Sequence, residues 1–317
     1  MPNQFTIYRS TDTSAPVLTG QTGSLITLLD ACLVNGYGSK TAAGWGKAFS
    51  GTSKAAYRAA SGSRLYYRIQ DDGPGAGTFK EARIRGYEVM TDVDTGTGLF
   101  PTTTQAANGQ FIRKSATADS TARTWIVIAD ARTVYLFVLT GDVANTYFTA
   151  NFGEFYSFVA NDAYNGYVMA RFTENSAAGN VERLDLLDVA LAGGNTVVTY
   201  CPRGHTGLGS CVILSKHGDG AKGNSTSLIG EIPFTNPADG GLYMSPVWFA
   251  DPTTAPVNGI RGRQRGFWHF LHVAASVSDG DTVSGTGGLA GKTFLFIKSG
   301  GNSGVYTIET SATLDTN

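Results

Sequence analysis

Charged side chains are scarce in this chain. Only 15% of its 317 residues are Asp, Glu, Lys or Arg, whereas soluble proteins average about 25%. The 24 basic and 25 acidic residues give a formal net charge of −1, and the sequence contains neither a basic block nor an acidic tail. The electrostatic signature of a nucleic-acid-binding protein is therefore missing, and we expect no nucleic acid partner.

Long apolar runs are missing too. No stretch approaches the roughly 18 consecutive apolar residues that a membrane-spanning helix needs. The first residues, MPNQFTIYRSTDTS, lack the basic-then-apolar layout of a secretory signal. We therefore expect synthesis in a cytosol and no membrane partner.

Cysteine is rare, with only Cys32, Cys201 and Cys211 in the chain. No CxxC spacing occurs, so neither a zinc site nor a disulfide framework is indicated. A reducing cytosol keeps thiols free. Cys201 and Cys211 nevertheless bracket the short segment CPRGHTGLGSC, which a disulfide would close after the protein leaves the reducing cell. Both states of this pair remain open at the level of sequence.

Glycine is abundant, with 41 residues, and apolar residues make up 42% of the chain, enough to form a core. Short runs of β-branched and aromatic residues alternate with turn formers. We predict a mainly β protein with a β-sandwich or barrel-like core, divided into a small N-terminal α+β lobe (residues 1–105) and a β-rich main domain (residues 106–317). No repeat period indicates a solenoid or propeller.

One helix and one hairpin are predicted most clearly. Apolar residues recur at helical spacing over Ser24–Leu33, and Gly36 follows where a positive-φ cap is favoured. Thr124–Asp130 and Thr133–Leu139 are strands joined by two residues, which is typical of a hairpin. Because both strands are almost continuously apolar, we expect burial on both faces. Further short strands are predicted at residues 56–58, 65–70 and 82–90, and in six segments after residue 195.

The segment Tyr147–Tyr167 holds eight aromatic residues without regular alternation. Aromatic side chains contribute large buried areas to cores and interfaces. The segment is therefore interpreted as a core plug or subunit contact, with an aromatic platform for sugars as the alternative.

Several partial motifs are too incomplete to predict chemistry. Gly285–Thr293 lacks the first glycine of a phosphate loop and continues into a strand pattern rather than a helix. The Asp92/Asp94 and Asp279/Asp281 pairs lack a complete calcium-loop spacing, and we interpret them as turn residues. His269 and His272 lie in an aromatic segment that favours a strand, which argues against shared metal ligation. We expect no catalytic, cofactor or metal site.

Arg261, Arg263 and Arg265 alternate along RGRQRG. In an extended segment all three would face one side. Such a row would bind carboxylates of a neighbouring subunit or, as the alternative, an acidic host surface glycan.

Two motifs, YGSKTAAGW within Leu33–Trp45 and RGRQRGFW within Ile260–Trp268, together with Leu289–Ile297, resemble an uncharacterised family of virion structural proteins of tailed bacteriophages. The resemblance spans most of the chain. It implies a particle component made in the host cytoplasm, with no stated chemistry.

We therefore expect a non-enzymatic structural protein of the virion, placed in the head decoration, neck, collar or tail, which binds itself and other virion proteins. The sparse surface charge suits burial against identical subunits. The attachment or packing residues expected from the motifs are Tyr37, Lys40, Trp45, Arg261, Arg263 and Arg265. The alternatives are a receptor- or glycan-binding module and a particle-borne hydrolase, which would need a cleft with convergent carboxylates or a Ser/His pair.

Overall fold

The computed structural model describes residues 4–72, 80–141, 145, 147–171, 197–204, 207, 209–212, 214–216, 241–251, 259–270, 272, 276–298 and 305–311. Across these residues the chain is mainly β, with a large curled antiparallel sheet and a single short α-helix. This confirms the predicted fold class.

The larger sheet contains twelve of the described strands, and its main path runs β1-β9-β10-β11-β13-β8-β5-β4-β3-β2, with β14 added to β13 and β15 added to β14. The strands are β1 (Thr6–Arg9), β2 (Gly46–Gly51), β3 (Lys54–Arg58), β4 (Tyr66–Gln70), β5 (Lys80–Tyr87), β8 (Gln110–Ser115), β9 (Thr124–Ala129), β10 (Thr133–Leu139), β11 (Tyr147–Glu154), β13 (Gly166–Arg171), β14 (Val197–Cys201) and β15 (Cys211–Val212). Strands from both sides of residue 105 share this sheet, since β1 pairs with β9 and β5 pairs with β8.

The second sheet contains seven described strands in the order β16-β17-β18-β21-β20-β19, with β12 also paired to β18. They are β12 (Tyr156–Ser157), β16 (Leu214–Lys216), β17 (Met244–Asp251), β18 (Gly259–Phe270), β19 (Thr282–Ser284), β20 (Thr293–Lys298) and β21 (Val305–Glu309), while β6 (Val89–Asp92) and β7 (Thr95–Thr97) form a separate hairpin. The strands predicted after residue 195 are confirmed within the described residues.

The β9–β10 hairpin is shared by two hydrophobic cores. In its register Val134 lies opposite Ala129 and Phe137 opposite Ile126. Side chains alternate between the faces of a strand. Trp125, Val127, Ala129, Val134, Leu136 and Val138 enter the first core, whereas Ile126, Ile128, Tyr135 and Phe137 enter the second. The predicted hairpin and its burial on both faces are confirmed.

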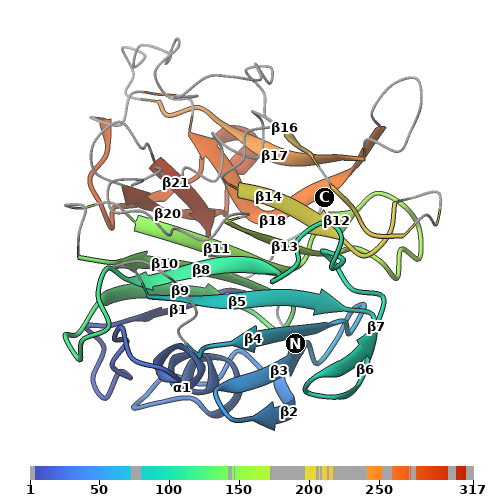
Figure 1. Cartoon of the computed structure of the whole chain (residues 1–317). Coiled ribbons are helices and arrows are strands. Elements are labelled where there is room, and N and C mark those ends of the chain that lie inside the picture. The colour runs from blue at the N-terminus through green and yellow to red at the C-terminus, as the bar shows by residue number, and fades with distance from the viewer. Residues whose placement is uncertain are drawn as a thin grey trace.

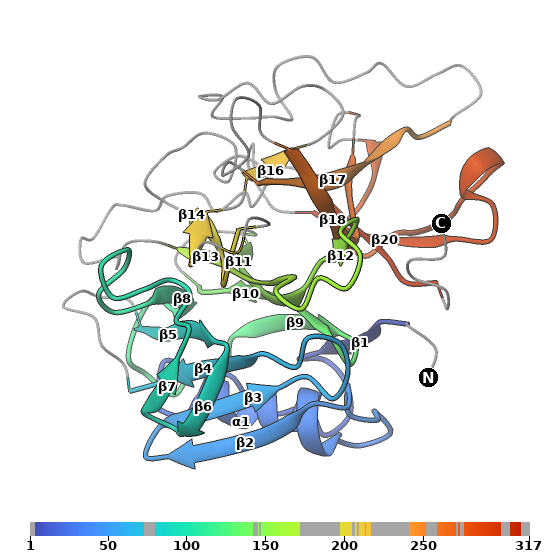
Figure 2. The same ribbon diagram turned by 90° about the vertical axis from the view of Figure 1, so that its right-hand side faces the viewer.

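The two cores define three layers (Figures 1 and 2). The helical segment α1 covers one face of the large sheet and buries Leu25, Ile26, Leu28 and Leu29 in the first core. The second sheet covers the other face, with Phe249, Phe267 and Ile308 in the second core. The large sheet is therefore covered on both sides at β9 and β10.

The predicted helix is confirmed, and its C-terminal part is wider than an α-helix. α1 (Ser24–Leu29) continues into the π-helix η1 (Asp30–Asn35). Gly36 adopts φ 76° and its N–H donates to the carbonyl of Ala31 at 2.8 Å. The segment is held at its start by Asp71, whose carboxylate accepts a hydrogen bond from the Leu25 N–H at 2.8 Å and pairs with the fully buried Lys114. A buried ion pair thus fixes the helix on the sheet.

Candidate functional site

Tyr37 and Lys40, from the N-terminal motif, bind β1 and the turn that follows it. The Tyr37 hydroxyl donates to the Asp12 carboxylate at 2.8 Å, and burial together with this bond raises the pKa of Tyr37 well above its usual value. The Lys40 ammonium donates to the Ile7 carbonyl at 2.9 Å and lies 3.7 Å from Asp12. These residues hold the motif against β1, at an edge of the sheet.

Trp45, the last residue of the same motif, lies in the first core. Its indole is 3% exposed and packs edge-on against Tyr67 and Phe152. Its Nε1–H donates to the carbonyl oxygen of Asp130 at 2.7 Å. The structure therefore places Trp45 in the core, next to the turn between β9 and β10.

Arg265, from the C-terminal motif, binds the same turn from the side of the second sheet. Its guanidinium lies 2.7 Å from the Asp130 carboxylate and donates to the Thr133 hydroxyl at 3.1 Å, with both charged side chains at most 5% exposed. The backbone N–H groups of Arg132 and Thr133 also donate to the Asp130 carboxylate. Asp130 thus joins the two sequence motifs, which lie more than two hundred residues apart in the chain.

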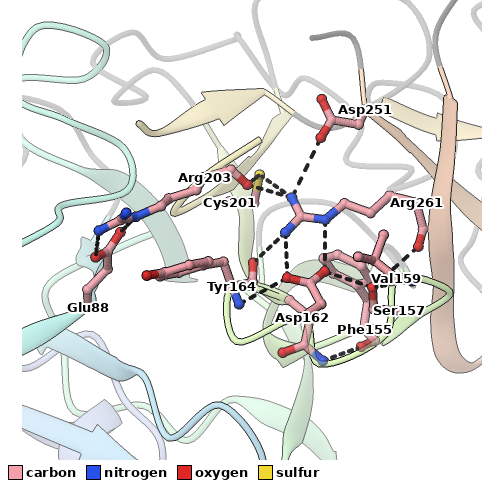
Figure 3. Close-up of polar contacts among 11 residues, drawn as sticks. Glu88, Phe155, Ser157, Val159, Asp162, Tyr164, Cys201, Arg203, Asp251 and Arg261 are labelled. Carbon is pink, nitrogen blue, oxygen red and sulfur yellow. Dashed lines mark hydrogen bonds and ion pairs between the residues drawn. The ribbon is translucent and has the colours of Figure 1, made fainter. Parts of the chain in front are cut away.

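Arg261 is the centre of a second buried network, shown in Figure 3. It donates two parallel hydrogen bonds to the Asp162 carboxylate at 2.9 and 2.8 Å, lies 3.7 Å from Asp251 and donates to the Arg203 carbonyl. Bidentate pairs of this kind are strong and directional. Burial alone would lower the pKa of Arg261, but the contacts with Asp162 outweigh burial and raise it. The network joins the 155–165 turn to β18.

Arg263 differs from its two neighbours because it stays near the surface. Its guanidinium lies 5.2 Å from the centre of the half-buried Tyr156 ring, a cation–π geometry. The three arginines therefore have three different intramolecular neighbours, Asp162, Tyr156 and Asp130, and Arg261 and Arg265 are buried within the protomer.

An exposed apolar patch lies beside Arg263. Phe158 is 53%, Val159 43% and Ile260 56% exposed. The Phe158 N–H donates to the Arg261 carbonyl at 2.8 Å, β12 pairs with β18 at Tyr156–Arg263, and the Phe158 ring lies 5.8 Å from the Tyr156 ring, so these residues lie on adjoining segments of backbone. Apolar and aromatic side chains beside an arginine are enriched in protein interfaces. We call these residues, with Tyr156 and Arg263, the β12–β18 patch.

A groove of about 530 Å³ lies beside the Glu88–Arg203 ion pair. The two side chains form two hydrogen bonds of 2.7 and 2.6 Å, and the Arg203 guanidinium stacks 4.3 Å from the centre of the Tyr164 ring (Figure 3). Leu99, Thr102 and Ser210 also line the groove. Its volume lies in the range of small-ligand sites, and its wall offers both donors and acceptors.

Most aromatic rings of Tyr147–Tyr167 are in the protein interior. Tyr147, Phe148, Phe152, Phe155 and Tyr167 are buried, Tyr156 and Tyr164 are half-buried, and Phe158 is exposed. This burial fits the interpretation of the segment as part of the core, and Phe158 is its exposed aromatic residue.

Residues of the partial motifs form turns, strands, ion pairs and hydrogen bonds within the fold. Gly285–Thr293 passes through the 3₁₀ turn η3 (Gly287–Leu289) into β20, so the predicted strand is confirmed. Asp94 pairs with Lys54 and Arg68, and His272 accepts a hydrogen bond from the Tyr243 N–H at 2.7 Å. Among the described residues, no group of three His, Cys, Asp or Glu side chains is arranged to hold a metal ion.

Sequence reasoning missed Asp130 and Asp162, the two carboxylates around which the motifs are organised. Each lies at a turn, where aspartate is common for local reasons. The arginines of RGRQRG were the signal that could have indicated these carboxylates. An arginine that is buried in an apolar sheet requires a buried acidic partner.

No protein-family model matches the chain, and no curated protein matches it. In the part of the chain that the structure describes, no helix has the length and apolar content to cross a bilayer.

Proposed function

We propose that this protein is a non-enzymatic structural component of a tailed-phage virion, in the head decoration, neck, collar or tail, and that it acts by homo-oligomeric assembly and attachment to other particle proteins. The family resemblance of its two motifs supports the placement in a virion. The β12–β18 patch supports assembly, and it is the observation that carries the proposal.

Assembly is supported by the difference in burial between residues of the C-terminal motif and their neighbours in β12–β18. Arg261 and Arg265 form buried ion pairs with Asp162 and Asp130, so both guanidinium groups are bound within the protomer. Ile260 is exposed and Arg263 is half-buried on β18, which pairs with β12 next to the exposed Phe158. Ile260–Trp268 is buried apart from the exposed Ile260 and the half-buried Arg263, and an exposed apolar side chain beside further apolar residues fits an attachment surface.

The first experiment measures the mass of the purified protein by mass photometry and compares the variants Phe158→Glu and Val17→Glu. Val17 is 59% exposed and lies outside the patch, so it is a matched control for adding a charge. We expect an oligomer for the wild type and Val17→Glu, and dissociation for Phe158→Glu. A monomeric wild type, or equal behaviour of both variants, would contradict assembly through this patch.

The second experiment places the protein in the particle. Antibodies raised against the purified chain are applied to intact virions and located by electron microscopy. Labelling at one position, such as the neck or tail, is the expected result. Absence of label from particles that have been partly dissociated to expose internal surfaces would contradict the virion placement.

The groove beside Glu88 and Arg203 favours a second candidate function, a receptor- or glycan-binding module displayed on the virion. The groove has hydrogen-bonding groups of both kinds, whereas the buried arginines of RGRQRG are occupied within the fold. The test is adsorption of fluorescent protein to host cells, with Arg203→Ala compared with Arg83→Ala. Arg83 also forms an exposed ion pair, with Asp72. Loss of adsorption for Arg203→Ala alone supports this second function.

A further inference from the structure

Two cysteines occupy directly opposite backbone positions in a pair of short strands. β14 and β15 run antiparallel, with Tyr200 opposite Val212 and Cys201 opposite Cys211. Cys201 is the last residue of β14, and Cys211 is the first residue of β15. The fold therefore brings together two of the three cysteines of the chain.

The backbone register suits a disulfide. Directly opposite residues of an antiparallel pair have Cα atoms about 4.5 or 5.5 Å apart, and disulfides span Cα separations of about 4.4 to 6.8 Å. Both cysteines lie at strand ends, so a bond between them constrains only the ends of two short strands. Cys32 belongs to η1 and is buried in the first core, whereas Cys201 is buried in the second.

Two polar contacts of the Cys201 thiol are weak. Its Sγ lies 3.4 Å from the Arg203 carbonyl and 3.8 Å from the Arg261 guanidinium. Thiols are weak hydrogen-bond donors and acceptors. Arg261 keeps its two hydrogen bonds to Asp162 when the sulfur changes state.

We propose that Cys201 and Cys211 form a redox pair, which closes to a disulfide when the protein meets a disulfide oxidant such as oxidised glutathione. One cysteine thiolate attacks the oxidant, forms a mixed disulfide and releases one glutathione thiolate. The other cysteine thiolate then attacks the mixed disulfide and releases the second. The two cysteine protons end on the two glutathione thiols, so the protein is oxidised and glutathione is reduced.

Closure of this bond fixes one wall of the groove beside Glu88. Pro202, Arg203, Gly207, Gly209 and Ser210 all line the groove, and all lie between the two cysteines. A disulfide at the base of this segment ties both of its ends to one point. The groove is then bounded by a covalently closed loop.

The sequence provides a direct test, because trypsin cleaves after Arg203, which lies between the two cysteines. Cleavage after Arg183, Arg203 and Lys216 leaves Cys201 in peptide 184–203 and Cys211 in peptide 204–216, while Cys32 lies in peptide 10–40. The full chain is incubated with oxidised glutathione, denatured with an alkylating agent, digested without reductant and analysed by mass spectrometry. We expect peptides 184–203 and 204–216 as one linked species, about 2 Da lighter than their sum because two hydrogens are lost, and peptide 10–40 alkylated.

Dithiothreitol added before digestion should abolish the linked species. Alkylation of both Cys201 and Cys211 after incubation with the oxidant, or a linked species that contains peptide 10–40 instead, would overturn the proposal.

Variants provide an independent readout. Cys32→Ser should keep the linked species, and Cys211→Ser should lose it. Oxidised wild type should melt at a higher temperature than reduced wild type, since the bond restricts the unfolded chain, and Cys211→Ser should show no such shift. Wild type measured in both redox states gives the answer even if a variant fails to fold. Equal melting temperatures of the two wild-type states would count against a closed loop.

Discussion

Trp45 and Arg265 bind the same residue, Asp130, from opposite layers of the molecule. Trp45 donates its indole N–H to the backbone carbonyl at 2.7 Å, and Arg265 pairs with the carboxylate at 2.7 Å. The indole belongs to the first core, whereas Arg265 lies on the strand of the second sheet that supplies Phe267 to the second core. One residue of the β9–β10 turn therefore binds a side chain from each of the two motifs.

We predict that Arg265→Met destabilises the protein far more than Arg263→Met. Loss of Arg265 leaves the Asp130 carboxylate buried without its cation, which costs about 3–5 kcal/mol of unfolding free energy. Loss of Arg263 removes a surface cation–π contact, which contributes about 0.5–1 kcal/mol. Urea unfolding followed by tryptophan fluorescence measures both. Equal losses for the two variants would contradict the assigned role of Asp130.

Trp45→Phe should lower the unfolding free energy by about 1–3 kcal/mol, because the buried Asp130 carbonyl loses a donor. The phenyl ring keeps part of the packing against Tyr67 and Phe152. The measurement is urea unfolding followed by far-ultraviolet circular dichroism, which does not depend on the removed indole. Unchanged stability would mean that the N–H bond to Asp130 contributes nothing.

Asp162→Asn should change how stability depends on acid. Burial tends to raise the pKa of Asp162, but hydrogen bonds from Arg261 and Ser157 outweigh it and hold the pKa below the usual aspartate value. A lowered folded-state pKa means that the carboxylate stabilises the fold above its unfolded pKa, and that this contribution is lost as the pH falls through the folded pKa. The variant should be less stable than wild type at neutral pH, and the gap should narrow in acid. Melting temperatures across this pH range test the prediction, and a constant gap contradicts it.

Glu154→Gln should change the pH dependence of stability in the opposite direction. Burial raises the pKa of Glu154, although Ser63 donates to its carboxylate from the backbone and the hydroxyl. A raised folded-state pKa means that the stability which the protonated acid contributes is lost as the pH rises through the folded pKa.

Glutamine keeps an acceptor for Ser63 and carries no charge. The variant should therefore be at least as stable as wild type at neutral pH, and the two should converge below the usual glutamate pKa. The same melting series used for Asp162→Asn measures this, and a variant that is less stable only at neutral pH would refute it.

The elements that were predictable are those fixed by local pattern. The β9–β10 hairpin follows from two apolar β-branched runs with a two-residue connection, and α1 follows from its helical spacing. The widening of η1 was not predictable, because it depends on the Gly36 N–H reaching the carbonyl of Ala31.

The partners of the motif residues were not predictable either. Nothing local pairs Arg261 with Asp162 or Arg265 with Asp130, which are 99 and 135 positions apart. Alternation along RGRQRG predicted one row on one side. In the structure each arginine takes a different neighbour, because β18 meets β12 at Arg263 and the β9–β10 turn at Arg265.

Among the described strands, the main path of the large sheet ends at β1 and β2. At β1 the Lys40 ammonium occupies the carbonyl of Ile7, and at β2 the register slips between Lys47 and Phe49 while Lys47 holds Asp30 at 2.8 Å. Lysines and bulges on rims block the addition of a foreign strand. These features disfavour the addition of a strand from another chain at β1 and β2.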